Sequence, residues 1–259
     1  MQIEMPAGWP RDEAEAVAEQ DRLRGSVRTE GELRDARWVA GVDVAYGNES
    51  PLVAAAVVVL DAKTLEPVEQ RTAVGTAQFP YVPGLLAFRE LPTLIEALRL
   101  LERVPDVFVC DGYGIAHPRR FGLASHLGVL TGVPSLGVGK TAFIGRYDEP
   151  GNRRGDYADL VDEGRDGRPE VIGRVLRTQH ATKPVYVSIG HAVTLDAASD
   201  LVLRLALRYR LPETTRAADR LCRVALSQAL ALVAEPTTEL AATEVDAAPI
   251  DAEQADRVS

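Results

Sequence analysis

The chain has 259 residues, a hydrophobic fraction of 46% and a formal net charge of −9, which taken alone disfavours a nucleic-acid partner. The hydrophobic fraction is ordinary for a globular protein, and no apolar stretch is long enough to cross a membrane. Residues 1–10 show no secretory pattern, and Cys110 and Cys222 stand alone in apolar surroundings, so we expect a cytoplasmic protein with reduced cysteines.

The negative charge is unevenly distributed. Residues 235–259 contribute −6 of the net charge of −9, and we predict that they form an acidic disordered tail behind a single domain at 1–234. Residues 112–147 contain no Asp or Glu but four Lys or Arg residues. This stretch fits either a segment that faces an anion or an ordinary basic surface loop.

The first half of the chain predicts a helix followed by three strands. An exposed amphipathic helix is expected at 11–24, and apolar runs predict strands at 38–46, 52–60 and 66–75. The short connection at 61–64 indicates an antiparallel hairpin.

The remaining segments alternate between helical and strand patterns. They predict, in order, a helix at 85–101, a strand at 107–110, a helix at 123–130, a strand at 134–138, a polar loop at 152–168, strands at 171–177 and 184–189, and helices at 195–207 and 215–233. This order predicts a mixed α/β sheet with antiparallel first strands and helices on both faces.

Two of the predicted strands carry an aspartate. Asp43 lies within the first strand, and Asp111 directly follows the strand at 107–110. Burying a carboxylate in a strand is costly unless it is paired or binds a metal ion, and oxygen ligands from separate strands suit magnesium. An aspartate after an apolar run also caps turns, so these two residues by themselves leave both interpretations open.

A rigid segment with an aromatic residue follows at 80–84. Two prolines flank Tyr81, which could insert into a base stack or could pack on a structural turn. Gly84 allows a tight turn or close approach to a ligand. Glu90 follows near the start of the next predicted helix, where the helix dipole alone is a sufficient reason for an acid.

Three further motifs carry basic or imidazole groups. The loop at 114–122, with His117 and Arg119, leads into a helix and suits contact with a phosphate or a base edge, although it could be a plain connection. Lys140 follows a glycine-rich segment that fails the P-loop pattern, and we interpret it as a point charge beside a phosphate or metal, or as a surface lysine. His191, after a predicted strand, could bind metal, transfer protons, contact phosphate or simply pack.

Together these segments resemble the endonuclease V family. The resemblance rests on four motifs in order, at 42–46, 80–90, 111–119 with 139–140, and 188–191. It extends to 211–216 and covers roughly residues 10–225. The loop at 148–168 is longer and more polar than the resemblance leads us to expect, and the acidic tail is not part of the family pattern.

The resemblance implies a ribonuclease H-like fold and a metal-dependent endonuclease. Such enzymes recognise deoxyinosine in DNA and nick the second phosphodiester bond 3′ to the lesion. Carried over to this sequence, Asp43, Glu90 and Asp111 would bind Mg²⁺, with Mn²⁺ as a substitute. His191 would lie beside them, and Lys140 would assist at the scissile phosphate.

The resemblance also assigns the substrate contacts. Tyr81 would fill the space left by the rotated base, and Gly84, Gly112 and Gly122 would lie near the base pocket. Nothing in the chain indicates an obligate dimer, so we expect a monomer. An inosine-directed endoribonuclease, another ribonuclease H-like nuclease and a non-catalytic nucleic-acid binder are the alternatives, and the sequence does not discriminate DNA from RNA.

Overall fold

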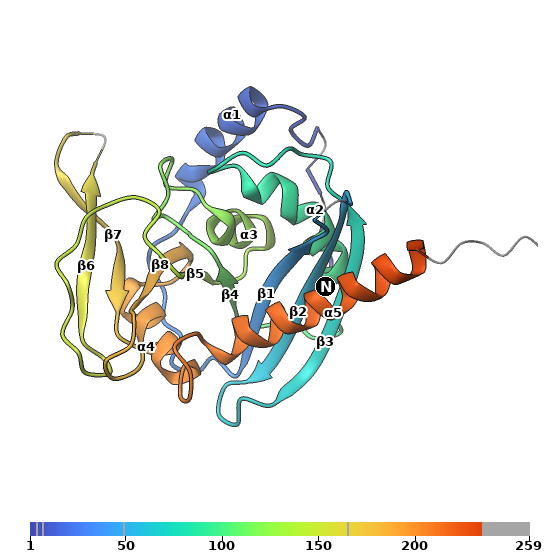
Figure 1. Cartoon of the computed structure of the whole chain (residues 1–259). Coiled ribbons are helices and arrows are strands. Elements are labelled where there is room, and N and C mark those ends of the chain that lie inside the picture. Colours follow the sequence, from blue (N-terminus) through green and yellow to red (C-terminus); the bar gives the residue numbers. More distant parts are fainter. Residues whose placement is uncertain (4, 7, 49, 165, 235–259) are drawn as a thin grey trace, which may run out of the picture.

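The fold is built around one mixed β-sheet, seen in a computed structural model that describes residues 1–3, 5–6, 8–48, 50–164 and 166–234 (Figure 1). The described residues form eight strands in the order β3-β2-β1-β4-β5-β8-β7-β6. The strands are β1 (Trp38–Tyr46), β2 (Leu52–Asp61), β3 (Pro67–Thr76), β4 (Val107–Asp111), β5 (Ser135–Gly139), β6 (Tyr157–Glu163), β7 (Pro169–Leu176) and β8 (Val185–His191). The predicted tail lies outside the described residues.

The sheet is parallel in its centre and antiparallel on both sides. β1, β4 and β5 run parallel, whereas β2 and β3 on one side and β8, β7 and β6 on the other pair antiparallel. The predicted antiparallel start is therefore confirmed. Because β1, β4 and β5 point the same way, their carboxyl ends meet at one edge, the place where open α/β sheets usually bind ligands.

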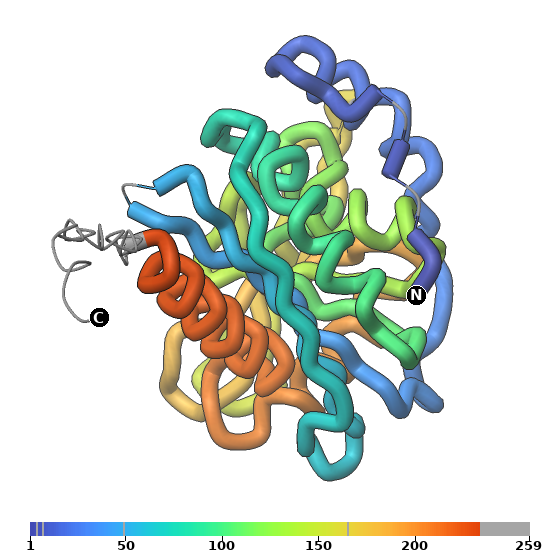
Figure 2. The backbone as a smooth tube through the Cα atoms, turned by 90° about the vertical axis from the view of Figure 1, so that its right-hand side faces the viewer, coloured from blue at the N-terminus to red at the C-terminus, as the bar shows by residue number. Residues whose placement is uncertain are grey.

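Helices cover both faces of the sheet, as the sequence predicts. They are α1 (Glu13–Leu23), α2 (Leu86–Arg99), α3 (Leu123–Thr131), α4 (Leu195–Leu205) and α5 (Glu213–Ala234), with a short 3₁₀ turn, η1 (Arg24–Ser26). Figure 2 shows α5 on one side of the strands and the green helices α2 and α3 on the other. Alternate residues of β1 serve the two faces, since Val42 packs with α2 and α3 whereas Val39 packs with the α4 cluster.

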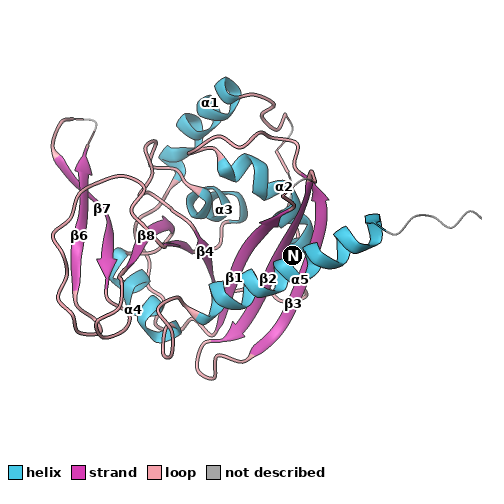
Figure 3. Ribbon diagram, viewed as in Figure 1, coloured by secondary structure: helices cyan, strands magenta, loops and turns pink. Residues whose placement is uncertain are grey.

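One predicted loop contains a strand. β6 lies within the segment predicted as a loop at 152–168 (Figure 3), whereas the other predicted elements are present with ends shifted by at most two residues. β6 is the last strand of the sheet, beside β7, and Leu160 is its one buried residue. A strand that buries so little has no apolar pattern to detect, so that prediction is wrong for a clear physical reason. None of the described helices is long and apolar enough to span a membrane.

Helix α2 contains a proline that the fold accommodates with a partner from elsewhere in the chain. Pro92 has no N–H to donate to the carbonyl of Phe88, four residues earlier. The indole N–H of Trp9 donates to that carbonyl at 3.1 Å instead. The N-terminal segment thereby anchors α2, the helix that also carries Glu90.

A buried histidine lies next to this contact. His126 on α3 is 1% exposed, and its ring lies 5.1–5.5 Å from the rings of Trp9, Phe88 and Phe121. Neither ring nitrogen has a hydrogen-bond partner among the described residues. Burial therefore lowers the pKa of His126 from 6.5 to about 4.

Glycine at position 41 lets α5 approach β1 closely. A Cβ atom added to Gly41 would lie 2.1 Å from the backbone oxygen of Thr214, at the start of α5. No side chain larger than hydrogen fits there without moving that backbone. This contact seats α5 over β1 at the level of Asp43.

We expect Gly41→Ala to destabilise the protein by about 3 kcal/mol or more, because the α5 backbone must shift to admit the methyl group. Chemical denaturation followed by circular dichroism measures the change. Gly25→Ala is the matched control, since no atom lies within 4 Å of the added Cβ, and its effect should stay within about 0.5 kcal/mol. An unaltered midpoint for Gly41→Ala would contradict the close approach.

His126→Leu should change how the free energy of unfolding depends on pH below pH 6.5. In the folded protein the pKa of His126 is about 4, below its ordinary value of 6.5. As the pH falls, the imidazole is therefore protonated in the unfolded chain before it is protonated in the folded protein. The stability associated with His126 is complete above pH 6.5 and is lost as the pH falls toward 4. Urea denaturation should show that the leucine variant gains about 2 kcal/mol relative to wild type between pH 8 and pH 5. His180→Gln, at an exposed position, should give no such gain, and equal profiles for the leucine variant and wild type would refute the assignment.

Candidate active site

The parallel register of β1 and β4 brings the two predicted aspartates together. Val42 pairs with Cys110, so Asp43 and Asp111 follow at the next position of adjacent strands. Residues in register on neighbouring strands share a face, and Gly41, two residues before Asp43, contacts the start of α5. Both carboxylates therefore project from the α5 face at the carboxyl edge of the sheet.

A third carboxylate reaches this edge from α2. Glu90 is 6% exposed and lies in the second turn of α2, near the start of the helix as the sequence suggested. The hydroxyl of Tyr46, near the end of β1, donates a hydrogen bond to Glu90 Oε1 at 2.6 Å. This bond holds one oxygen of the buried carboxylate in a defined orientation.

The surroundings disfavour the ionised forms of Asp43 and Glu90. Burial raises the pKa of Asp43 from 3.8 to about 7, and the charge of Asp111 adds to the effect. Burial likewise raises the pKa of Glu90 to about 8, against the hydrogen bond from Tyr46 and with the charges of Asp43 and Asp111. The site thus concentrates negative charge in a poorly solvated place, a property typical of functional sites.

Lys140 places a positive charge beside the carboxylates. Its ammonium group pairs with Asp111 Oδ2 just beyond the end of β5. Burial opposes the charged ammonium, but the hydrogen bond to Asp111 and the charges of Asp43 and Asp219 outweigh burial and raise the pKa of Lys140. Arg210 donates to the Lys140 carbonyl at 2.6 Å and so fixes the backbone at this position.

Asp219, on α5, is a member of this electrostatic cluster that the sequence analysis missed. Its charge contributes to the raised pKa values of both Asp43 and Lys140. Asp219 also pairs with Arg223 at 2.8 Å. In the sequence, Asp219 is an acidic residue that follows the buried Ala218 in a predicted helix. That pattern is too common to indicate a functional site.

The donor set suits a divalent cation, although the side chains are not gathered around one. Within the described ranges, no group of three or more His, Cys, Asp or Glu side chains forms a ready-made metal centre. Asp43 and Glu90 nevertheless have raised pKa values, because both are buried and, to a smaller extent, because other negative charges lie nearby. Carboxylate oxygens are the ligands that Mg²⁺ and Mn²⁺ accept, and a cation would relieve this repulsion.

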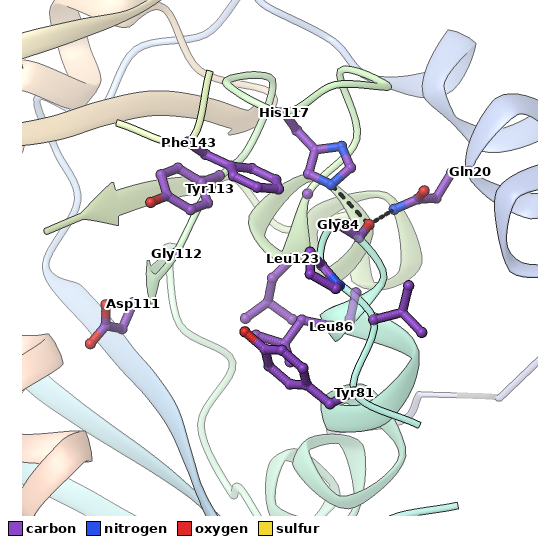
Figure 4. A pocket seen from close by; sticks show the side chains of 14 residues that line it. Gln20, Tyr81, Gly84, Leu86, Asp111, Gly112, Tyr113, His117, Leu123 and Phe143 are labelled. Carbon is purple, nitrogen blue, oxygen red and sulfur yellow. Dashed lines mark hydrogen bonds between the residues drawn. The ribbon is translucent and has the colours of Figure 1, made fainter. Parts of the chain in front are cut away.

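A cavity of about 270 Å³ opens beside the carboxylates (Figure 4). Asp111 and Gly112 line it, so the cavity and the acidic cluster share a wall. The predicted pocket residues Tyr81, Gly84, Gly112, Gly122 and His117 all lie in its lining. Residues that the sequence analysis did not single out complete the wall, namely Gln20, Val82, Pro83, Leu86, Ala87, Tyr113, Leu123 and Phe143.

The side chains of His117 and Arg119 hold the protein itself together. His117 Nε2 donates to the Gly84 carbonyl at 2.9 Å, and Nδ1 accepts from the Arg119 amide at 3.2 Å. Burial and the nearby Arg119 charge lower the pKa of His117 to about 4, which keeps the ring neutral. The Arg119 guanidinium donates to Gln20 and Gly84. The expected contact of Arg119 with a phosphate or a base edge stays a prediction.

His191 does not join the carboxylates, which corrects the sequence expectation. It pairs with Ser135 at the start of β5, whereas Asp111 pairs with Val138 near the end of β5. The two positions are about 10 Å apart along that strand. The cause is that β8 runs antiparallel to β5, so the end of β8 lies at the opposite edge of the sheet. There His191 contacts Arg28. Burial and the charge of Arg28 together lower the pKa of His191.

The mixed sheet, with Asp43 on β1 next to Asp111 at the end of β4, is consistent with the ribonuclease H-like class of nucleases. Residues 21–220 match the model of one family, described as Endonuclease V. A relative named Endonuclease V, from Streptomyces avermitilis, is 56% identical over 231 residues, which cover 88% of this chain and 99% of that protein. The chain therefore belongs to the endonuclease V family.

Solved structures of the family agree with this fold. The crystal structure of Endonuclease V from Streptomyces avermitilis has a TM-score of 0.82 and 54% identity, over 89% of this chain and 100% of that one. Endonuclease V from Ciona intestinalis was solved in complex with a 24mer DNA containing an inosine followed by a ribo-adenosine. That structure has a TM-score of 0.74 and 29% identity, over 83% of this chain and 98% of that one.

Proposed function

We propose that the protein is a magnesium-dependent DNA repair endonuclease that recognises deoxyinosine and nicks the second phosphodiester bond 3′ to it. The observation that carries this proposal is the wall shared by the cavity and the acidic cluster, at Asp111 and Gly112. When a base lies in the cavity, the DNA strand that carries this base lies next to the carboxylates. The inosine-containing DNA bound by the Ciona relative supports this choice of substrate.

Asp43, Glu90 and Asp111 are the residues that would hold the metal ion, and Asp219 adds negative charge from α5. Magnesium, or manganese in its place, supplies an activated water and a stabilised leaving oxygen when bound. Tyr46 keeps Glu90 oriented through its hydroxyl. The side chain of Lys140 is 49% exposed, so its ammonium can meet a phosphate oxygen while the Lys140 backbone stays fixed by Arg210.

Recognition of the lesion falls to the cavity and its rim. Tyr81 is 71% exposed at the rim, between prolines that restrict its backbone. Unstacking a base costs a few kcal/mol, and an aromatic ring that takes its place in the stack offsets part of that cost. Inside, Gly112 leaves room for a planar base to approach the backbone closely, since no atom lies within 4 Å of the position that a Cβ would take there. Gly84 and Gly122 also line the cavity.

A ribonucleotide substrate is the second candidate. The DNA in the Ciona complex carries a ribo-adenosine directly after the inosine, so that relative accommodates a ribose at this position. An inosine-containing RNA therefore belongs in the same assay. We further propose that residues 1–234 act as one nuclease domain, as a monomer and in the cytoplasm.

The proposal is tested with a labelled duplex carrying one deoxyinosine, in the presence of Mg²⁺. Wild type should nick it. Asp43→Ala should abolish nicking while lesion binding remains, because Asp43 would hold the metal ion and does not line the cavity. Gel electrophoresis locates the nick, and fluorescence anisotropy measures binding. An undamaged duplex and a sample with EDTA are the controls. Cleavage of the undamaged duplex at the same rate as the deoxyinosine duplex would contradict the proposal. Nicking by Asp43→Ala at the wild-type rate would contradict the assignment of Asp43 as a metal ligand.

Tyr81→Ala should chiefly weaken binding of the lesion. Loss of one base–aromatic stack, about 1–3 kcal/mol, raises the Kd for deoxyinosine DNA by about 5- to 150-fold. Tyr81→Phe keeps the ring and serves as the control, so its Kd should stay close to that of wild type. An unchanged Kd for the alanine variant would remove Tyr81 from the recognition surface.

A further inference from the structure

Two loops beside the end of β5 carry basic residues that the proposed chemistry does not use. They are the β7–β8 loop, with Lys183, and the α4–α5 loop, with Arg208 and Arg210. Lys183 and Arg208 are exposed, and neither side chain has a hydrogen-bond or ion-pair partner within the described ranges. Their charges are therefore available to a partner from outside the chain.

Arg210 connects these loops to the acidic cluster. Its Nε donates to the Lys183 carbonyl at 2.9 Å, and its Nη2 donates to the carbonyls of Pro184 at 2.8 Å and Lys140 at 2.6 Å. All of these acceptors are backbone carbonyls, so they leave the positive charge of Arg210 unneutralised. Lys140 in turn pairs with Asp111. The basic residues therefore continue directly from the carboxylates.

Four residues from three segments thus form one basic surface, namely Lys140, Lys183, Arg208 and Arg210. They come from three stretches that contain no Asp or Glu, at 112–147, 177–195 and 201–212, in a chain with a net charge of −9. By itself, the first stretch fits an ordinary basic loop as well as a segment that faces an anion. The meeting of all three stretches at one place favours an anionic partner.

Polar contacts hold the α4–α5 loop in place. Thr178 Oγ1 donates to the Arg210 carbonyl at 2.7 Å, and Gln179 Nε2 donates to the Ala206 carbonyl at 2.6 Å. Arg154 Nη1 donates to the same Ala206 carbonyl at 2.7 Å. The backbone that carries the basic side chains is therefore fixed before a partner binds, which lowers the entropic cost of binding.

An exposed aromatic ring among these cations favours a nucleic acid over a small anion. Tyr209 is 51% exposed, and the guanidinium carbon of Arg216 lies 3.4 Å from its ring centroid. Arg216 also pairs with Glu213, the acid that follows this loop in the chain, at 3.7 Å, so that carboxylate already has a cationic partner. Basic grooves that also present aromatic rings are typical of proteins that follow a nucleic-acid strand.

We propose that the basic surface binds the phosphates of the lesion-bearing DNA strand on the 3′ side of the scissile bond. This inference rests on the proposed function, since it specifies where the strand runs once a base lies in the cavity. None of the four basic residues lines that cavity, whereas Asp111 both lines it and pairs with Lys140. The acidic cluster therefore lies between the cavity and the basic surface. Because the proposed nick is 3′ to the lesion, the strand that continues past the carboxylates is its 3′ segment.

The double variant Lys183→Gln/Arg208→Gln tests this inference, since both side chains are exposed and without partners among the described residues. Fluorescence anisotropy in EDTA measures Kd for a deoxyinosine duplex at several salt concentrations. Each phosphate contact contributes about 0.9 to the slope of log Kd against log salt concentration, so the slope should fall by about 1.8. The same two lost contacts should raise Kd by about 10- to 60-fold at about 0.1 M salt.

Uncharged methylphosphonate groups locate the contact along the strand. Replacing the phosphates immediately 3′ to the scissile bond should weaken binding by wild type and leave the Kd of the double variant unchanged. Replacing phosphates 5′ to the lesion should weaken both proteins by the same factor. If the double variant remains as sensitive to the 3′ replacement as wild type, the basic surface does not bind that segment and the inference is overturned.

Arg37→Gln/Arg103→Gln is the matched control. It removes two exposed positive charges that lie over Trp38, at the amino end of β1 and thus away from the carboxyl edge. Its slope should equal that of wild type. If wild type prefers the deoxyinosine duplex but the Lys183→Gln/Arg208→Gln variant matches it at every salt concentration, the inference alone fails. If wild type binds the deoxyinosine duplex no better than an undamaged one, the proposed function fails and the inference fails with it.

Discussion

The repulsion among carboxylates at the carboxyl edge of the central strands is the constraint on which the site depends. Parallel pairing of β1 and β4 sets Asp43 beside Asp111, and burial leaves little water to screen them. Around this pair, Tyr46 donates to Glu90, and Lys140 pairs with Asp111. Each of these contacts offsets part of a charge imbalance that a divalent cation would offset more fully.

The cavity and the acidic cluster adjoin each other because they share the segment at the end of β4. Asp111 faces the carboxylates and Gly112 continues into the cavity wall. The opposite wall depends on Gly84, whose carbonyl is held by donors from α1 and from the loop before α3. The acidic cluster thus lies next to a wall that is held by a separate hydrogen-bond network.

Much of this architecture could be predicted because local patterns report burial. β1 and β4 are continuous apolar runs, and their aspartates stand out against them. β6 escaped prediction because an edge strand that buries only Leu160 lacks such a run. His191 was misplaced because the same strand-end pattern occurs at either edge of a sheet, and only the antiparallel pairing of β8 with β5 decides which edge it is.

By itself, the sequence determined which strands carry carboxylates, where glycines and prolines shape the cavity rim, and to which family the motifs belong. These features are local, since they depend on residue type and on spacing along one segment. Only the tertiary structure decided that Asp219 enters the acidic cluster, that His191 does not, and that Gln20 holds Gly84. Those relations join segments far apart in the chain, and strand direction and helix packing settle them, which no local pattern encodes.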